Sequence, residues 1–133
     1  MKPTIAVVIP NFNDSETLKQ CLDSVFEQDQ RPEQVIVVDD QSTDKSLEIL
    51  QACLRDVPVA KLIVNPVRVG TMAALNAGLE HVTADYALFL SANDFLKPGI
   101  FLRARDRIAA DGYPGVNQCV MHHNCSFLNP SIF

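Results

Sequence analysis

Two adjacent carboxylates at the end of an apolar run are the residues of this chain best placed to do chemistry. The run leads directly into Asp39 and Asp40. Two carboxylates about 5 Å apart repel each other by roughly 3 kcal/mol at an effective dielectric near 20, unless water, a ligand or a cation relieves them. The pair therefore favours a binding edge, although a solvated strand end followed by a helix cap at Ser42 or Thr43 is an equally ordinary explanation.

Three further loops, at residues 10–13, 65–71 and 91–94, are rich in side chains that can hydrogen-bond or bind a metal ion. In the first of them, Phe12 stands between two Asn residues rather than in an apolar run, which favours stacking on a base over burial in a core. In the second, Arg68 and the backbone before a predicted helix suit a phosphate group. Simple capping of that helix explains the second loop equally well.

Apolar runs and helical periodicities alternate along the chain. Strands are predicted at residues 4–9, 34–38, 60–64 and 86–90, and helices follow the first three of them, with apolar faces near residues 18–26, 45–54 and 72–80. Crossovers long enough to hold a helix predict a parallel sheet with right-handed connections. The predicted fold class is α/β, a Rossmann-like parallel sheet with helices on both faces.

This topology decides where the polar loops lie. The carboxyl ends of parallel strands share one edge of the sheet, and ligands bind in the crevice beyond that edge. All four polar loops follow predicted strands. We therefore expect them to surround one site.

Composition limits the partners. The chain has 133 residues, 47% of them hydrophobic, and a net charge of −5 without any block of Lys or Arg. This suits one domain with a real core and argues against nucleic acid or anionic lipid as a broad binding surface. There is no apolar run long enough to cross a membrane and no signal peptide, so a cytoplasmic location without a disulfide framework is expected.

The last segment differs from the rest. Residues 112–133 contain no Lys, Arg, Asp or Glu but carry Cys119, His122, His123 and Cys125. Adjacent ligands in a short tail seldom close a tetrahedron, so zinc is disfavoured. The predicted organisation is a domain at residues 1–111 and an atypical uncharged tail at residues 112–133.

Four motifs, at residues 7–13, 37–44, 76–78 and 89–99, occur in an order and at intervals that resemble the nucleotide-sugar half of family 2 glycosyltransferases. The resemblance covers about Pro3 to Asp111. It implies a GT-A fold, whose first half binds a nucleoside diphosphate sugar and whose second half holds the acceptor and a catalytic base. Only the first half is expected in this chain, so no catalytic residue is assigned.

The resemblance also implies roles for individual residues. Phe12 would stack near the base, Pro10 would shape the loop against uracil or its equivalent, and Asp40 would accept hydrogen bonds from base or ribose. Asp39 is the lesser candidate of the acidic pair. The full predicted nucleotide-binding set is Pro10, Phe12, Asn13, Asp39, Asp40, Arg68 and Asn93.

A divalent metal, Mg²⁺ or Mn²⁺, is expected to neutralise the diphosphate, with Asp94 as its protein ligand. The family usually places acidic residues where this chain has Ser91 and Asn93, so the site would bind metal weakly. A plain turn before Pro98 is the alternative.

The expected function is transfer of a sugar from a nucleotide-sugar donor, with a UDP-sugar as the expected donor, to an unidentified sugar, lipid or protein acceptor by direct displacement. The rival hypothesis is a truncated or degenerate donor-binding module without turnover. A membrane-associated partner and a homodimer formed through the tail are left open. A receiver-like domain fits less well, because its acidic pair follows the first strand, and no P-loop or dinucleotide motif occurs.

Overall fold

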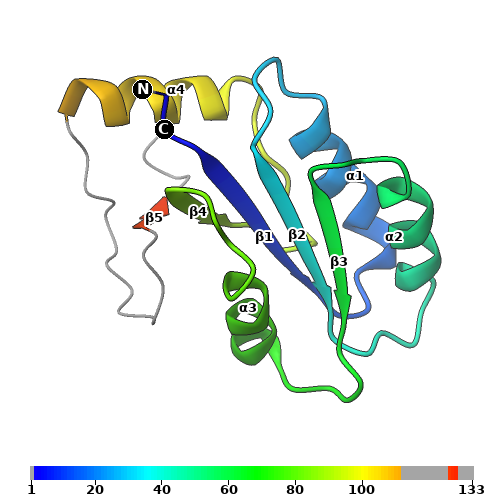
Figure 1. Cartoon of the computed structure of the whole chain (residues 1–133). Coiled ribbons are helices and arrows are strands. Elements are labelled where there is room, and N and C mark those ends of the chain that lie inside the picture. Colours follow the sequence, from blue (N-terminus) through cyan, green and yellow to red (C-terminus); the bar gives the residue numbers. More distant parts are fainter. Residues whose placement is uncertain (1, 112–125, 129–133) are drawn as a thin grey trace.

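The computed structural model describes residues 2–111 and 126–128, and it places five parallel strands in the order β3-β2-β1-β4-β5. Helices cover both faces of this sheet (Figure 1). The elements are β1 (Ile5–Asn11), α1 (Ser15–Phe26), β2 (Gln34–Asp39), α2 (Ser46–Leu54), β3 (Ala60–Val64), α3 (Thr71–Leu79), β4 (Tyr86–Phe89), α4 (Ile100–Asp111) and β5 (Ser126–Leu128). The predicted α/β fold with a parallel sheet is confirmed.

The central strand β1 is buried along its whole length, which explains why it is almost uniformly apolar. Side chains alternate between the two faces of a strand. Ile5, Val7 and Ile9 belong to the core shared with α1, α2 and α4, whereas Val8 packs in a separate cluster with side chains of α3. A strand covered on both faces needs apolar residues at odd and even positions alike.

The predicted apolar face of the first helix is confirmed. In α1, the buried residues are Leu18, Cys21, Leu22 and Val25. The spacing of three and four residues places them on one side of the helix, against the sheet. Burial also raises the pKa of the Cys21 thiol to about 12, and the nearby carboxylates of Asp94 and Asp14 act in the same direction.

Helix α3 lies on the opposite face of the sheet and approaches it closely at Gly78. A Cβ atom at Gly78 would stand 2.6 Å from Val8 Cγ1 and 3.1 Å from Val38 Cγ2. No real side chain tolerates the shorter distance, so the absence of a Cβ allows α3 to pack directly on β1 and β2.

Helix α4 was not predicted, although its buried Ile100, Phe101, Ala104 and Ile108 recur at helical intervals. Its Arg105 is only 4% exposed and lies at the amino edge of the sheet. Arg105 Nη2 donates to both carboxylate oxygens of Glu33, at 2.7 and 2.9 Å, and Nε donates to the carbonyl of Pro3 at 3.3 Å. The arginine thereby ties α4 to the first residues of the chain and to the loop before β2.

The carboxyl-terminal strand β5 pairs in parallel with β4, with Tyr86 opposite Ser126. The predicted division at residue 111 coincides with the last residue of α4 and stays a prediction. The cysteines and histidines considered for zinc, residues 119–125, lie outside the described residues. Within the described ranges, no helix is both long and apolar enough to cross a membrane.

Candidate nucleotide site

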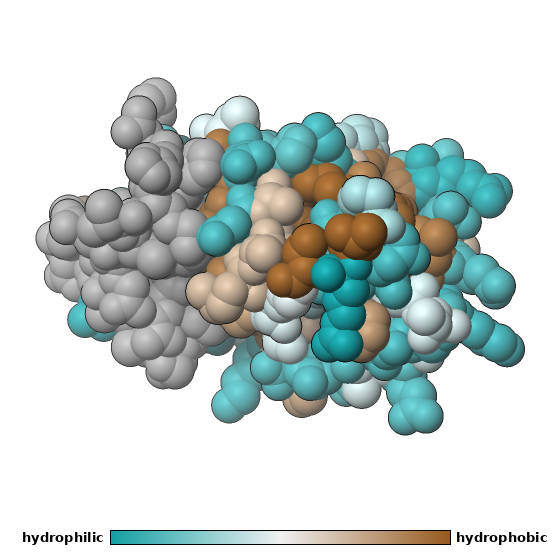
Figure 2. Space-filling view, turned by 90° about the horizontal axis from the view of Figure 1, so that it is seen from below, coloured by the Kyte–Doolittle hydropathy of each residue, from teal (hydrophilic) through white to brown (hydrophobic). Residues whose placement is uncertain are grey.

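The four polar loops lie together at the carboxyl edge of the sheet, as the topology requires. Figure 2 views this edge and shows hydrophobic residues gathered near its centre among hydrophilic ones. A hollow of about 200 Å³ opens there. Its lining consists of Pro10, Asn11, Phe12, Asp14, Asp40, Arg68, Thr71, Ala74, Ser91 and Asn93.

Asp40 anchors the loop that follows β3. Its carboxylate is only 2% exposed, and it accepts hydrogen bonds from Asn65 Nδ2 at 3.0 Å and from the backbone N–H groups of Val69 and Gly70 at 2.9 and 2.8 Å. A carboxylate has about four acceptor positions. Three are used by the protein, so one remains on the carboxylate that lines the hollow.

Asp40 stays ionised at neutral pH. Burial opposes the charge, but the hydrogen bonds from Asn65, Val69 and Gly70 and the positive charge of Arg68 outweigh it and lower the pKa of Asp40. The N–H of Gly70 belongs to the backbone before α3 that the sequence offered for a phosphate group, and it is already taken by a protein carboxylate. Gly70 has φ of +92°, a conformation that favours glycine, and this lets its N–H turn toward Asp40.

Phe12 stands at the mouth of the hollow with an arginine on its ring. It is half-buried, and the guanidinium carbon of Arg68 lies 3.7 Å from the ring centroid. This is a cation–π contact, worth about 0.5–1 kcal/mol at an exposed position. One face of the aromatic platform is thus covered by a side chain that is itself exposed and can move.

Asp39 is buried like its neighbour but faces different groups. Its Oδ1 accepts hydrogen bonds from Asn11 Nδ2 at 2.9 Å and Ser42 Oγ at 2.7 Å, and its Oδ2 accepts one from the Ser42 N–H at 3.1 Å. These contacts fix the loop after β2 against the end of β1. Asp39 does not line the hollow.

Asn11 was missed by the sequence analysis. It continues β1 one residue beyond Pro10, is 1% exposed and lines the hollow. Its amide nitrogen is held by Asp39 and Ser42, while its Oδ1 is buried without a hydrogen-bond partner among the described residues. A polar residue that extends an apolar strand is the signal that could have marked it. Buried acceptors without partners are rare and call for an explanation such as a ligand or water.

Asn13 and Asp44 join the first two loops beside the hollow. Asn13 has φ of +56°, and its Oδ1 accepts the N–H groups of Thr43 at 2.7 Å and Asp44 at 3.2 Å. Asp44 in turn accepts the N–H of Ser15 at 3.0 Å and of Ser46 at 2.9 Å, so a single carboxylate caps the first turns of α1 and α2. These bonds outweigh desolvation and lower the pKa of Asp44 to about 2.

A second depression, of about 370 Å³, adjoins the hollow, and Asp14 and Asn93 line both. Asn13 lines only the second one. The pKa of Asp14 is raised by burial and by the charge of Asp44, and a hydrogen bond from the Phe12 backbone partly offsets this. The two depressions together form one crevice along the edge of the sheet.

The loop after β4 presents Asn93, rather than Asp94, to the hollow. Asn93 Oδ1 accepts a hydrogen bond from Ser91 Oγ at 2.8 Å, and both residues belong to the lining. Asp94 is exposed and outside the lining. Across residues 2–111 and 126–128, no group of three or more His, Cys, Asp and Glu side chains comes together that could hold a metal ion.

Five of the predicted nucleotide-binding residues therefore share one hollow: Pro10, Phe12, Asp40, Arg68 and Asn93. Asn13 lies in the adjoining depression. Asp39 accepts a hydrogen bond from Ser42 and so supports the loop after β2. Asn11 and Asp14 join the lining without having been predicted there. The binding roles of all these residues stay predictions.

Comparison of the sequence with known families identifies the family of this chain. Residues 6–131 match the family described as Glycosyl transferase family 2. The chain therefore belongs to glycosyltransferase family 2. The match runs past Asp111, where the resemblance seen in the motifs ended, and it includes β5.

Two curated relatives illustrate the likeness. An uncharacterized glycosyltransferase of Haemophilus influenzae is 36% identical over 94 residues, which cover 71% of this chain and 38% of the relative. The poly(ribitol-phosphate) beta-glucosyltransferase of Bacillus spizizenii is 32% identical over 102 residues, covering 74% of this chain and 16% of that protein. This chain thus spans well under half the length of either relative.

Solved structures share the fold. Mannosyltransferase PcManGT from Pyrobaculum calidifontis, in complex with GDP-Man and Mn²⁺, is 26% identical with a TM-score of 0.74, over 82% of this chain and 33% of that one. S. aureus TarS in complex with UDP-GlcNAc gives a TM-score of 0.77 at 24% identity, over 90% of this chain and 37% of that one. The TarS likeness shows the GT-A fold alone.

Proposed function

We propose that this chain forms the donor-binding part of a glycosyltransferase and that the hollow holds the nucleotide of a UDP-sugar. The observation that carries the proposal is the pairing of an ionised, buried Asp40 with a half-buried aromatic ring, Phe12, across one small hollow. A carboxylate accepts hydrogen bonds from an imide N–H or from ribose hydroxyls. An aromatic face stacks on a base.

The hollow is large enough for a base but too small for the whole donor. Its volume of about 200 Å³ is below the roughly 300–1,000 Å³ of sites that enclose a whole ligand, so it suits only part of the donor. Uracil is the smaller base and would lie against Pro10 with Asp40 beside it. The remainder of the donor would extend into the adjoining depression lined by Asn13 and Asn93.

Arg68 is the cation best placed for the diphosphate. It is exposed and lines the hollow, where its guanidinium lies over the ring of Phe12 and its charge interacts with Asp40. Guanidinium groups pair with phosphate oxygens through short, charge-assisted hydrogen bonds. We propose that Arg68 leaves the ring when the donor binds, which frees that face of Phe12 for the base.

A divalent metal ion fits here only together with the donor. Mg²⁺ is commonly held by one or two carboxylates plus substrate phosphates, and it keeps several waters. Asp94 and the amide oxygen of Asn93 would be the protein ligands. When bound, such an ion neutralises the charge that develops on the diphosphate as the sugar departs.

The proposed reaction is displacement of the nucleoside diphosphate from the anomeric carbon by an acceptor hydroxyl. The new bond joins the acceptor oxygen to that carbon, the bond to the diphosphate breaks, and a carboxylate base takes the hydroxyl proton. No described residue is assigned as this base. The acceptor, whether a sugar, a lipid or a protein, and the cytoplasmic location stay predictions.

Calorimetric titration with UDP-glucose in the presence of Mn²⁺ tests the nucleotide assignment. Phe12→Ala should weaken binding about tenfold, because stacking contributes about 1–3 kcal/mol per base. Met72→Ala is the matched control, since Met72 is 63% exposed and outside the hollow. Absence of binding, or equal affinity for the Phe12→Ala variant and the wild type, would remove the proposal, and tighter binding of GDP-mannose would replace uracil with guanine.

The metal assignment has its own pair of variants. Asp94→Ala should abolish the gain in donor affinity that Mn²⁺ gives, and Asn93→Asp should increase it, because a second carboxylate strengthens an oxygen site for a hard cation. The measurement is the ratio of UDP affinities with Mn²⁺ and with EDTA. A ratio that neither variant changes would show that these residues do not hold the ion.

A second candidate function is a module that binds the donor without turnover. The chain covers 38% of one relative and 16% of another. Incubation with UDP-glucose and a panel of acceptors separates the two candidates. Donor binding without release of UDP supports the module, and release of UDP supports the enzyme.

A further inference from the structure

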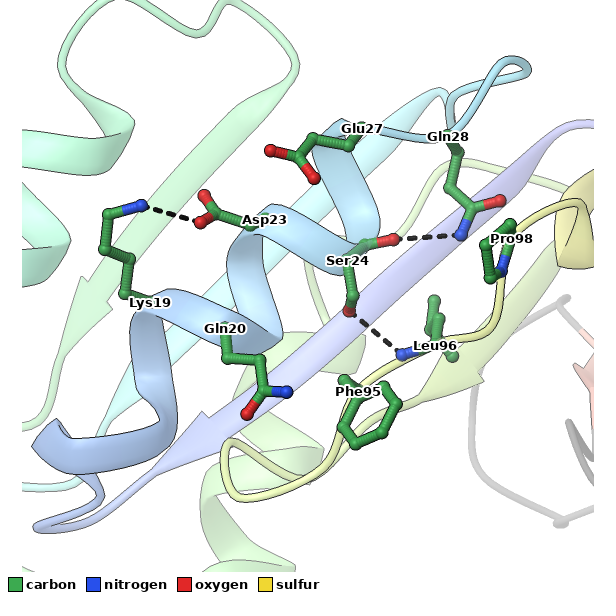
Figure 3. Close-up of a pocket in the computed structure, with 9 residues that line it drawn as sticks. All are labelled: Lys19, Gln20, Asp23, Ser24, Glu27, Gln28, Phe95, Leu96 and Pro98. Atoms are coloured by element: carbon green, nitrogen blue, oxygen red, sulfur yellow. Dashed lines mark hydrogen bonds and ion pairs between the residues drawn. The ribbon is translucent and has the colours of Figure 1, made fainter.

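A groove of about 590 Å³ runs between α1 and the loop that joins β4 to α4, away from the lining of the nucleotide hollow. Figure 3 shows Phe95, Leu96 and Pro98 on one side of it and side chains of α1, among them Gln20, on the other. No residue is shared between this lining and that of the hollow. The groove therefore needs its own explanation.

The floor of the groove is firmly built. Gln28, only 8% exposed, donates from Nε2 to the carbonyls of Ser24 and Lys97, both at 2.9 Å, and accepts the Gly99 N–H at 2.9 Å. Ser24 Oγ accepts the Leu96 N–H at 2.9 Å. These bonds fix the loop at residues 96–99 to α1, so the groove exists before any ligand arrives.

Phe95 projects from this fixed loop into solvent. Its side chain is 59% exposed, in contrast to the buried Leu96 that follows it. The face of an aromatic ring carries partial negative charge, which attracts the weakly positive C–H groups of a sugar ring. A large aromatic held outside the core at the wall of a preformed groove is suited to such stacking.

The opposite wall offers hydrogen-bonding groups that the protein does not use. Among the described residues, neither the Gln20 amide nor the Glu27 carboxylate has a hydrogen-bond partner. Asp23 uses only Oδ2, which contacts Lys19 Nζ at 2.6 Å. An amide supplies donors and acceptors, and a carboxylate supplies acceptors, so together they match sugar hydroxyl groups.

The charges in the groove select against an anion. Lys19 is paired with Asp23 and also interacts with the charge of Glu27, so the charged residues of the lining carry one negative charge in excess. A phosphate or carboxylate on the ligand would be repelled, and a neutral polyol would not. The ligand class that fits an aromatic platform, an amide and free carboxylate oxygens is an uncharged saccharide.

We propose that the groove beside Phe95 binds an uncharged sugar unit, as a subsite for a saccharide acceptor. Ser91 and Asn93 of the hollow and Phe95 of the groove belong to one short loop, so a saccharide held at Phe95 would lie one loop away from the donor. The acceptor role rests on the proposed function. The binding of a saccharide does not.

Saturation-transfer NMR of the whole chain with cellobiose, methyl glucoside and glucuronic acid tests this subsite. The two neutral sugars should receive saturation and the acidic one should not. Phe95→Ala should weaken cellobiose binding about fivefold, the loss expected for one aromatic contact, and Gln20→Ala should weaken it less. Phe95→Tyr should keep the affinity, and Leu102→Ala is the control, because Leu102 is 45% exposed and outside the groove.

The inference would be overturned by no saturation of either neutral sugar at millimolar concentration, or by equal saturation in the wild type and the Phe95→Ala variant. Stronger saturation of glucuronic acid than of the neutral sugars would also overturn it. A parallel titration with UDP keeps the two proposals apart. If UDP binds and cellobiose does not, only the subsite fails, and if cellobiose binds at Phe95 and UDP does not, only the donor assignment fails.

Discussion

Asp39 and Asp40 are neighbours in sequence and have different environments. Successive side chains of an extended strand point in opposite directions. Asp39 therefore meets Asn11 and Ser42, whereas Asp40 meets the backbone of the loop after β3. The sequence identified Asp40 as the stronger candidate, but its hydrogen bonds to Val69 and Gly70 depend on the path of a distant loop and could not be predicted.

The contact between Arg68 and Phe12 leads to a test that separates two roles of the arginine. Arg68→Ala should weaken UDP binding about tenfold, because it removes a charge-assisted contact with the diphosphate. The same variant should bind uridine as well as, or better than, the wild type, because the ring of Phe12 is uncovered. Calorimetric titration of both ligands gives the comparison.

Equal losses for UDP and uridine in the Arg68→Ala variant would contradict this account. They would mean that Arg68 acts by holding the ring of Phe12 and makes no separate contact with phosphate. Arg55→Ala serves as the control for the change of net charge, since this exposed arginine follows the last residue of α2 and is outside the lining of the hollow.

The first turns of α1 and α2 both depend on Asp44, which lies in the loop between β2 and α2. The N-cap residues of both helices, Asp14 and Lys45, make no side-chain capping bond. Asp44 accepts a backbone N–H from each helix instead. For α1 this cap comes from the loop after β2, and a cap supplied by another loop leaves no pattern at the helix itself.

Asp44→Ala should lower the free energy of unfolding by about 1–2 kcal/mol, because removing a helix cap typically costs about 1 kcal/mol and this residue serves two helices. Asp44→Asn keeps an acceptor oxygen and should lose less. Urea unfolding at neutral pH is the measurement. An Asp44→Ala variant as stable as the wild type would contradict the double cap.

The pKa of Asp44, which is about 2 in the folded state, predicts how the stabilities of the wild type and the Asp44→Asn variant depend on pH. The unfolded value is higher, near 3.8, so the stabilisation is present above about pH 4 and is lost as the pH falls toward 2. The difference in stability between the wild type and Asp44→Asn should therefore shrink through this range. A difference that stays constant down to pH 2 would exclude the lowered pKa as its cause.

The elements with strong local patterns were predicted, and those that depend on distant contacts were not. Four strands and three helices have apolar runs or helical periods that can be recognised in the sequence without knowledge of tertiary contacts. Helix α4 mixes its buried positions with five charged residues, which hides the apolar period, and β5 is three residues long. A strand that short is defined by its pairing with β4, which lies about 40 residues earlier in sequence.

At the level of the whole molecule, topology alone brought the four polar loops to one edge, and this part of the site was predictable. Which side chain of each loop faces inward was not. Asn93 lines the hollow and Asp94 does not, although the sequence favoured Asp94 as the metal ligand and both residues sit in the same turn. The direction of a side chain in a turn depends on backbone angles that composition does not determine.

The central claim is that loops distant in sequence form one nucleotide site at the carboxyl edge of the sheet. Amide chemical shifts of the ¹⁵N-labelled chain, followed while UDP is added with Mg²⁺, test it most directly. The account predicts saturable shifts concentrated at Phe12, Asp40, Gly70 and Asn93, and a titration midpoint about tenfold higher in UDP for the Phe12→Ala variant. Shifts confined to α4 or to the amino edge of the sheet, or no saturable shifts at all, would contradict it.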